Sequence, residues 1–224
     1  MSRSLRRAAL SSCAAVAVVL AVGSAQATTI SFASPAGTLG VSQTYGPITA
    51  YGYTAPTYGR DAGQLSAARL YGKTDGAGET GLGLAYTDDH EINTPTGSQA
   101  IVLDVGALTG QDLKLGFGSV QTGEAWRVGF SSSATLPTNE SAFSGYVTGT
   151  TAYPTLTDFG VLDSRYVIIE AAYAPGYDAE NCDTTDSNIL LTSLSATSVP
   201  EPASMTVLAA GLLGLGIARR RRAG

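Results

Sequence analysis

The stretch DLKLGFGSVQTGEAWRVGFS, residues 112–131, decides the fold class of this chain. Apolar residues alternate with polar or small residues on both sides of a turn-forming segment, as in β-strands that bury one face. The residues expected on the buried faces are Leu113, Leu115, Phe117, Trp126, Val128 and Phe130. Because the segment Gln121–Glu124 is short and contains Gly123, we expect it to join the two strands as a hairpin. The alternation also predicts that Trp126 is a core residue.

Similar patterns along the chain predict a domain built almost entirely from strands. Gly, Thr, Ser and Tyr are frequent, and no window of helical length has a clean apolar stripe. Strands are expected at Thr28–Ala33, Ile48–Tyr53, Gln64–Gly72, Gly81–Tyr86, Gln99–Val105, Asp112–Val120, Ala125–Ser131, Gly145–Thr151, Arg165–Ala172 and Asn188–Thr197. One helical turn is expected within Pro137–Phe143. Many short strands separated by turns are typical of an antiparallel β-sandwich or jelly roll, which we predict for residues 28–198.

The last 26 residues differ in character from this domain. They contain Val199, Pro200, Glu201 and Pro202, then the apolar run Met205–Ala218, and then Arg219, Arg220, Arg221 and Arg222. Proline fixes φ and has no N–H, so the Pro-Glu-Pro segment is expected to stay extended outside the sheets. The apolar run is short for a membrane span, but neighbouring small residues and snorkelling arginines lengthen it. We therefore predict a short transmembrane helix over the apolar run, stopped by arginines on the cytoplasmic side.

The first 27 residues have the three parts of a secretory signal peptide. A basic start with Arg3 precedes the apolar run Ala8–Gly23, and the small residues Ala25 and Ala27 form an A-x-A cleavage site. We expect signal peptidase to cut after Ala27. The body of the protein is then exported across the inner membrane.

The C-terminal tail, residues 199–224, closely resembles the PEP-CTERM sorting signal of Gram-negative bacteria that make extracellular polysaccharide. Proteins with that signal are processed by exosortase, a membrane enzyme similar to a transpeptidase. The resemblance implies a membrane-anchored precursor, exosortase as a processing partner, and delivery to the cell surface or to an extracellular, biofilm-like matrix.

The body is also similar to a group of PEP-CTERM ectodomains. The similarity lies in Gly81–Leu84, the acidic loop Thr87–Asn93, the strand Ile101–Asp104 and the final strand Asn188–Leu194, which runs into Val-Pro-Glu-Pro. It implies a β-sandwich shaped like a carbohydrate-binding module, with no established activity and no transferable binding residue.

The charge of the processed chain limits its partners. Residues 28–199 contain six basic and 17 acidic side chains, which gives a net charge of about −11. Nucleic acids and anionic membrane surfaces need a basic face, so we expect neither to be a partner.

Asp88, Asp89 and Glu91 lie within four residues and form the sharpest chemical candidate. Carboxylate oxygens are the ligands that Ca²⁺ prefers, so this loop is a candidate calcium site. A second acidic cluster falls in Asp178–Asn188. Neither cluster has EF-hand spacing, and the alternative for both is a solvated acidic loop. No other cofactor is expected.

The sequence favours a protein that is not an enzyme. It lacks G-x-S-x-G and Ser-x-x-Lys patterns, and His90 is its single histidine. Tyrosines gather in Tyr45–Tyr58 and in Tyr146–Tyr177, and exposed tyrosine rings can stack on sugars. We therefore expect a structural or adhesive matrix protein that contacts exopolysaccharide. The alternatives are a secreted glycan-active enzyme, which needs two carboxylates in a cleft, and a calcium-stabilised carbohydrate-binding module.

Overall fold

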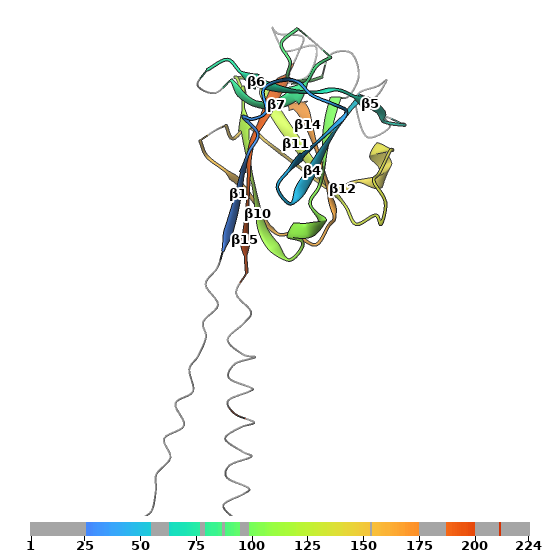
Figure 1. The fold of residues 1–224 in the computed structure, drawn as a ribbon, viewed down its shortest axis with the longest axis vertical. Helices are drawn as coiled ribbons and strands as arrows, with labels where there is room; N and C mark the ends of the chain where they lie inside the picture. Colours follow the sequence, from blue (N-terminus) through green and yellow to red (C-terminus); the bar gives the residue numbers. More distant parts are fainter. Residues whose placement is uncertain are drawn as a thin grey trace, which may run out of the picture. The chain divides into compact units, whose positions relative to one another are not determined.

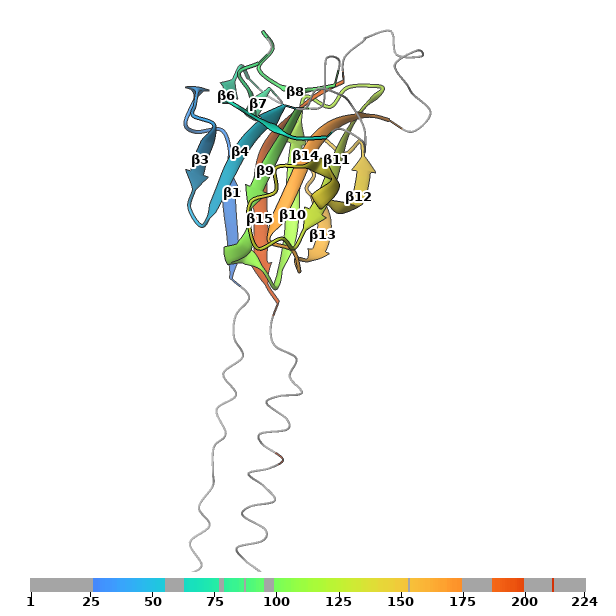
Figure 2. The same ribbon diagram turned by 90° about the vertical axis from the view of Figure 1, so that its right-hand side faces the viewer.

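The computed structural model describes residues 26–54, 63–76, 79–86, 88–94, 99–152, 154–174 and 187–199, together with Gly211. In the compact unit Ala25–Val199, the described residues form fifteen strands in two antiparallel sheets (Figures 1 and 2). This arrangement confirms the predicted all-β sandwich. The second unit comprises Met1–Ser24 and Pro200–Gly224. The predicted signal peptide and C-terminal helix therefore fall outside the described residues, apart from Ala27, Gln26 and Gly211.

The first sheet has the strand order β13-β10-β15-β7-β6-β2, and β1 and β8 also pair with β15. Its strands are β1 (Ala27–Ser31), β2 (Gly37–Thr38), β6 (Leu70–Thr74), β7 (Thr80–Leu84), β8 (Ile92–Asn93), β10 (Gln111–Gly118), β13 (Thr157–Val161) and β15 (Asn188–Ser198). The last strand, β15, thus lies inside this sheet. Strand β10 pairs with one edge of β15, and strands β1, β7 and β8 pair with different parts of its other edge.

The second sheet has the order β12-β11-β14-β9-β4-β3, and β5 pairs with β4. Its strands are β3 (Ser42–Tyr45), β4 (Ile48–Thr54), β5 (Ser66–Ala68), β9 (Gln99–Asp104), β11 (Glu124–Ser131), β12 (Ser144–Gly149) and β14 (Tyr166–Tyr173). Two 3-10 turns, η1 (Gly106–Leu108) and η2 (Glu140–Ala142), lie between strands. The turn η2 confirms the helical turn expected within Pro137–Phe143.

The predicted hairpin between β10 and β11 is wrong, because the two strands lie in different sheets. Residues 119–123 carry the chain from one sheet to the other, beginning at Ser119, whose φ of 58° is left-handed. Phe117 and Trp126 then stack across the core with ring centroids 4.6 Å apart. The alternation correctly placed both rings on buried faces, and Trp126 is 2% exposed. Alternation specifies the buried face of a strand but not its neighbour, so it could not exclude this crossing.

The second sheet is buried on both faces. Val167 and Ile169 of β14 point into the main core between the sheets, whereas Tyr166 and Ile168 join a second apolar cluster on the outer face. The segment 132–143 contributes Phe143 to that outer cluster. A chain segment therefore covers part of the outer face, and the pocket described below lies along its edge.

Candidate functional site

The residues that precede the sorting tail are paired with the last residues of the predicted signal peptide and with the strand that follows them. Ala27 of β1 is opposite Thr197 of β15, and both strands are seen side by side in Figures 1 and 2. The Ser198 N–H donates to the Gln26 carbonyl at 3.1 Å, and the Gln26 N–H donates to Ser198 Oγ at 2.9 Å. Val199, the first residue of the predicted motif, directly follows β15 and is 44% exposed.

The other predicted processing residues lie outside the described part of the chain. They are Ala25, Pro200, Glu201, Pro202, Arg219, Arg220, Arg221 and Arg222. Their roles in cleavage, sorting and membrane stop remain predictions from the sequence.

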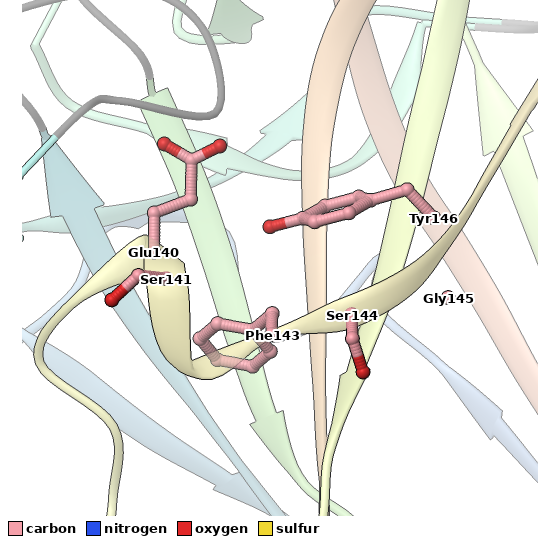
Figure 3. Close-up of a pocket in the computed structure, with 6 residues that line it drawn as sticks. All are labelled: Glu140, Ser141, Phe143, Ser144, Gly145 and Tyr146. Atoms are coloured by element: carbon pink, nitrogen blue, oxygen red, sulfur yellow. The ribbon is translucent and has the colours of Figure 1, made fainter.

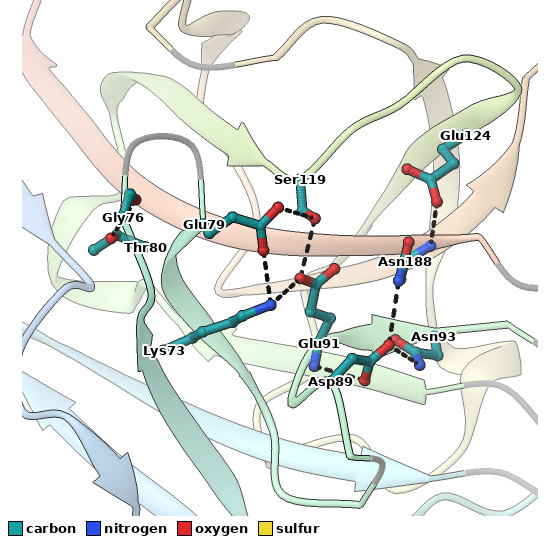
Figure 4. A network of polar contacts seen from close by, with 10 residues as sticks. All are labelled: Lys73, Gly76, Glu79, Thr80, Asp89, Glu91, Asn93, Ser119, Glu124 and Asn188. Carbon is teal, nitrogen blue, oxygen red and sulfur yellow. Dashed lines mark hydrogen bonds and ion pairs between the residues drawn. The ribbon is translucent and has the colours of Figure 1, made fainter.

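The three predicted cation ligands occupy different environments. Asp88 is exposed, Asp89 is half-buried and Glu91 is only 2% exposed. Asp89 accepts a bond from the Asn93 side-chain amide at 2.8 Å and from the Asn188 amide at 3.2 Å. Its other oxygen accepts from the Glu91 N–H at 3.3 Å, so Asp89 organises the start of β8 (Figure 4).

Glu91 belongs to a separate group, which we call the Lys73 cluster: Lys73, Glu79, Glu91 and Ser119. Lys73 Nζ lies 2.7 Å from Glu79 Oε2 and 2.5 Å from Glu91 Oε1. Ser119 Oγ donates to Glu91 Oε1 at 3.0 Å and to Glu79 Oε1 at 3.2 Å (Figure 4). The cluster thus joins β6 to the residues that precede β7 and β8 and to the residue after β10.

The two carboxyl groups of the Lys73 cluster have pKa values shifted in opposite directions. Burial raises the pKa of Glu91 to about 7, although bonds from Lys73 and Ser119 oppose the rise. The hydrogen bond from Lys73 lowers the pKa of Glu79. Burial alone would lower the pKa of Lys73, but its hydrogen bonds to both glutamates raise it. Near neutral pH the cluster therefore contains an ammonium, an ionised Glu79 and a Glu91 that exchanges its proton.

The geometry gives the predicted calcium site no support. Within the described ranges, no three His, Cys, Asp or Glu side chains are arranged to hold a metal ion. Asp89 is bonded to amide groups and Glu91 to Lys73, while Asp88 lies at the surface. Of the second acidic cluster, only Asn188 belongs to the described residues.

A second ion group lies on the outer face of the second sheet. We call it the Arg127 cluster: Arg127, Glu140, Glu170 and Tyr146. Arg127 and Glu170 are direct cross-strand partners on β11 and β14. Arg127 Nη2 lies 2.7 Å from Glu170 Oε2 and 2.6 Å from Glu140 Oε1, and both carboxylates belong to residues that are 1% exposed. A guanidinium is always charged, so these glutamates act as its counterions.

The backbone of β11 allows Tyr146 to cover this group. The Arg127 guanidinium lies 4.6 Å from the centre of the Tyr146 ring, within the range of a cation–π contact. The ring lies against Gly129, where a Cβ would come within 2.5 Å of Tyr146 Cε1. Glycine at this position therefore permits the close approach, which a larger residue would block.

Glu140 and Tyr146 also line a pocket of about 310 Å³ between η2 and β12. Figure 3 shows the Tyr146 hydroxyl pointing across this space toward the side on which Glu140 lies, with the Phe143 ring between η2 and β12. Ser141 and Ser144 add hydroxyl groups to the lining. The exposed part of the lining is made by Ser141 and Ser144 with the half-buried Tyr146, whereas Glu140 and Phe143 are buried behind it.

The structure separates the tyrosines that the sequence grouped together. Tyr51 and Tyr53 pack with Tyr146 in the outer cluster, but Tyr45 lies in the main core against Phe32. Tyr173 lies at the end of β14, where its hydroxyl is 3.3 Å from Thr94 Oγ1. Tyr58, Tyr153 and Tyr177 lie outside the described residues.

Sequence reasoning missed the two glutamates of the Arg127 cluster. Glu170 interrupts the apolar strand β14, and Arg127 interrupts the alternating strand β11. Opposite charges within two otherwise apolar strands are a usable signal for a cross-strand pair. Their separation of 43 residues leaves the register open, however, so sequence alone could not pair them.

The fold defines a β-sandwich protein whose last strand leads directly into a C-terminal tail. The PEP-CTERM protein-sorting motif matches residues 198–222, which confirms the chain as a PEP-CTERM protein. The motif indicates an exported protein that exosortase sorts from a membrane-anchored precursor. The match covers the tail and the end of β15. Comparison with curated proteins found no match, and neither did comparison with solved structures.

Among the residues with described structure, no helix is long and apolar enough to cross a membrane. The predicted transmembrane run, Met205–Ala218, lies outside those residues except for Gly211.

Proposed function

We propose that the processed domain is a non-enzymatic surface or matrix protein that contacts exopolysaccharide. Its sorting motif accounts for delivery outside the cell. The observation that carries the glycan contact is the outer face of the second sheet, where the half-buried rings of Tyr51 and Tyr146 gather and Tyr146 lines a pocket. Aromatic rings and fixed hydrogen-bonding groups are the means by which proteins hold the apolar faces and hydroxyls of small polar ligands.

The Arg127 cluster supports binding better than catalysis. The catalytic carboxylates of a glycosidase must reach the reacting bond, one as an acid and the other as a nucleophile or base. Here Glu140 and Glu170 both bind the same guanidinium nitrogen, at 2.6 and 2.7 Å. This arrangement fixes both carboxylates in a buried ion group, away from any reacting bond.

The glycan contact can be tested by co-sedimentation with polysaccharide purified from the producing strain. The exported, processed protein should sediment with that polysaccharide and remain in solution with an unrelated insoluble glucan. If it remains in solution with every glycan tested, the proposed contact is wrong.

The sorting step can be tested separately by intact-mass measurement of the exported protein. The mature chain should lack residues 1–27 and, in a host with exosortase, most of the segment after Pro202. Replacing Pro200, Glu201 and Pro202 with alanine should leave the protein in the membrane fraction. Exported protein that retains Met205–Gly224 would contradict processing at this motif.

A second candidate function, glycan hydrolysis, is favoured by the Lys73 cluster. The pKa of Glu79 is lowered and that of the neighbouring Glu91 is raised, as in carboxyl pairs that divide the roles of base and acid. Hydrolysis of oligosaccharides that is lost in Glu91→Gln would favour this function. If the wild-type protein hydrolyses no oligosaccharide at neutral or acidic pH, hydrolysis is excluded and binding is the one proposed function that stands.

A further inference from the structure

We propose that the uncleaved signal peptide blocks access to the start of the sorting motif, so that exosortase acts only after signal peptidase. The inference rests on the predicted cut after Ala27 and on the proposed sorting step. The pairing of β1 with β15 carries it, because this pairing brings the ends of the two signals together (Figures 1 and 2). Gln26 and Ser198, which are 172 residues apart in sequence, are in direct contact.

Ser198, the first residue of the matched motif, is the point of contact. Its N–H donates to the Gln26 carbonyl at 3.1 Å, and its Oγ accepts the Gln26 N–H at 2.9 Å. The neighbouring pair, Ala27 with Thr197, lies at the end of the β1–β15 ladder. Only Val199 separates these contacts from the Pro-Glu-Pro segment.

The cut after Ala27 removes both residues that contact the end of β15 from this side. The residues that remain, Thr28–Ser31, keep their partners in β15, and the Phe32 side chain stays in the core. The cut therefore frees the N–H and the hydroxyl of Ser198 without detaching β1 from the sheet.

The change at Ser198 matters to an enzyme that must bind this segment. Proteins that recognise extended segments form main-chain hydrogen bonds with them. In the uncleaved chain, Gln26 lies on one side of Ser198 and Gln111 of β10 on the other. The end of β15 is thus an inner strand before the cut and an edge strand after it. An edge strand presents unpaired backbone groups to a partner.

The order of the strands along the chain lets signal peptidase act first. The partner of β1 is β15 (Asn188–Ser198), which emerges near the end of export. Gln26 and Ala27 therefore lack this partner while the rest of the domain is being exported, and signal peptidase meets them unpaired. A chain that completes folding with its signal peptide in place pairs both residues with β15, and this pairing closes both processing sites together.

The test returns the lost contacts to a chain whose signal peptide has been removed. Inserting Gln-Thr directly after Ala27 gives a mature N-terminus with residues in the places of Gln26 and Ala27. The matched control inserts Gly-Asn at the same point, which adds the same length with residues that strands disfavour. Neither insertion creates a new A-x-A site, so signal peptidase should still cut after Ala27, and intact mass verifies this cut.

Processing is followed by pulse-chase and intact mass of the full chains in a host with exosortase. A hydrogen bond at an exposed strand end changes an opening equilibrium by about threefold to tenfold, so the Gln-Thr chain should lose its C-terminal segment at least about threefold more slowly than wild type. The Gly-Asn chain should be processed at the wild-type rate. In signal-cleaved chains from a host without exosortase, amide exchange of Ser198 should be slowed by Gln-Thr to a similar extent.

The possible failures are distinguishable. Equal rates for wild type and the Gln-Thr chain would overturn the proposed order and leave the sorting step standing. Equal slowing by both insertions would assign the effect to chain length and overturn it as well. Unchanged exchange of Ser198 in the Gln-Thr chain would contradict the pairing on which the order depends. A wild-type protein that retains Met205–Gly224 would overturn the sorting step itself.

Discussion

The Lys73 and Arg127 clusters both place one cation between two glutamates, yet their surroundings differ. Both glutamates of the Arg127 cluster are 1% exposed, and the guanidinium reaches Glu170 through Nε at 3.0 Å as well as through Nη2 at 2.7 Å. In the Lys73 cluster, Glu91 is buried while the Glu79 side chain is 40% exposed. The Tyr146 ring covers the Arg127 cluster, whereas the Lys73 cluster reaches the surface through Glu79.

This difference follows from the shapes of the two cations. A guanidinium presents five donors in one plane and can hold several acceptors in fixed geometry, whereas an ammonium acts as a compact point charge. Burial raises the pKa of Glu91 in the Lys73 cluster to about 7. The Lys73 cluster therefore contains a carboxyl group that responds to pH, while the Arg127 cluster forms a rigid wall beside the pocket.

The largest expected effect comes from removing the cation of the closed cluster. Arg127→Ala leaves two buried carboxylates without their counterion, which typically costs about 3–5 kcal/mol. Urea unfolding of the processed protein at neutral pH measures this loss. Arg165→Ala is the control, because the Arg165 side chain is 47% exposed and pairs with Asp104 at 2.9 Å. The control should lose less than about 1 kcal/mol. Equal losses would show that burial does not separate the two ion pairs.

Removing the other cation should have a smaller, pH-dependent effect. We expect Lys73→Ala to cost about 3 kcal/mol at pH 8, where Glu91 is mostly ionised in the wild type and must, in the variant, either stay charged without its cation or take up a proton. At pH 5.5 the loss should be less than half as large, because Glu91, whose pKa is about 7 in the wild type and higher without Lys73, is already protonated in both proteins. Urea midpoints at the two pH values measure both losses. Lys114→Ala, which breaks the exposed pair with Asp158, should change neither midpoint. A loss that is the same at both pH values would contradict the assignment of the proton to Glu91.

Glu91→Gln should flatten the pH profile of stability. The folded-state pKa of Glu91 is raised from 4.5 to about 7, so its contribution is fully present below pH 4.5 and is lost as pH rises through 7. At about 1.4 kcal/mol per pKa unit, we expect this group to make the wild-type protein lose about 3.5 kcal/mol of unfolding free energy across that window. Unfolding free energies in a pH series should show this slope in the wild type and not in the variant.

Glu79→Gln is the matched control for that experiment. The pKa of Glu79 is lowered from 4.5, so its contribution is present above pH 4.5 and is lost as pH falls below it. The control should therefore keep the wild-type slope between pH 4.5 and 7. A slope that disappears in both variants would assign the dependence to the whole cluster and not to Glu91.

The sequence predicted strands better than it predicted their partners. Alternation placed Leu113 and Val128 on buried faces, and both residues are in the core. It missed the short strands β2, β3, β8 and β13, most of which have too few residues to show a pattern. The predicted hairpin failed because a short loop with Gly123 can return a chain along the same sheet or carry it to the facing one.

The two clusters were beyond sequence reasoning for the same physical reason. Lys73 and Glu91 are 18 residues apart, and Arg127 and Glu170 are 43 apart, so their contacts depend on the register between strands. The sequence singled out Glu91 only as a member of an acidic loop, whose neighbouring carboxylates suggested a cation. Its neighbour in space is an ammonium, which supplies the positive charge that the acidic loop requires.

The smallest expected effect is the response of the acidic loop, residues 88–91, to calcium. It tests whether Lys73 already supplies the positive charge that this loop requires. Because Asp89 is bonded to the Asn93 and Asn188 amides and Glu91 to Lys73, a cation would have to displace existing contacts. We therefore expect CaCl₂ and NaCl at matched ionic strength to shift the melting temperature equally, through screening alone. A true site would instead stabilise the fold by about 2.7 kcal/mol at a hundred times its dissociation constant. A calcium-specific rise that Asp89→Ala abolishes and the exposed control Asp163→Ala does not would support the predicted cation site at Asp88, Asp89 and Glu91. In that case the Lys73 cluster would rearrange on binding, and Lys73→Ala should strengthen the response to calcium.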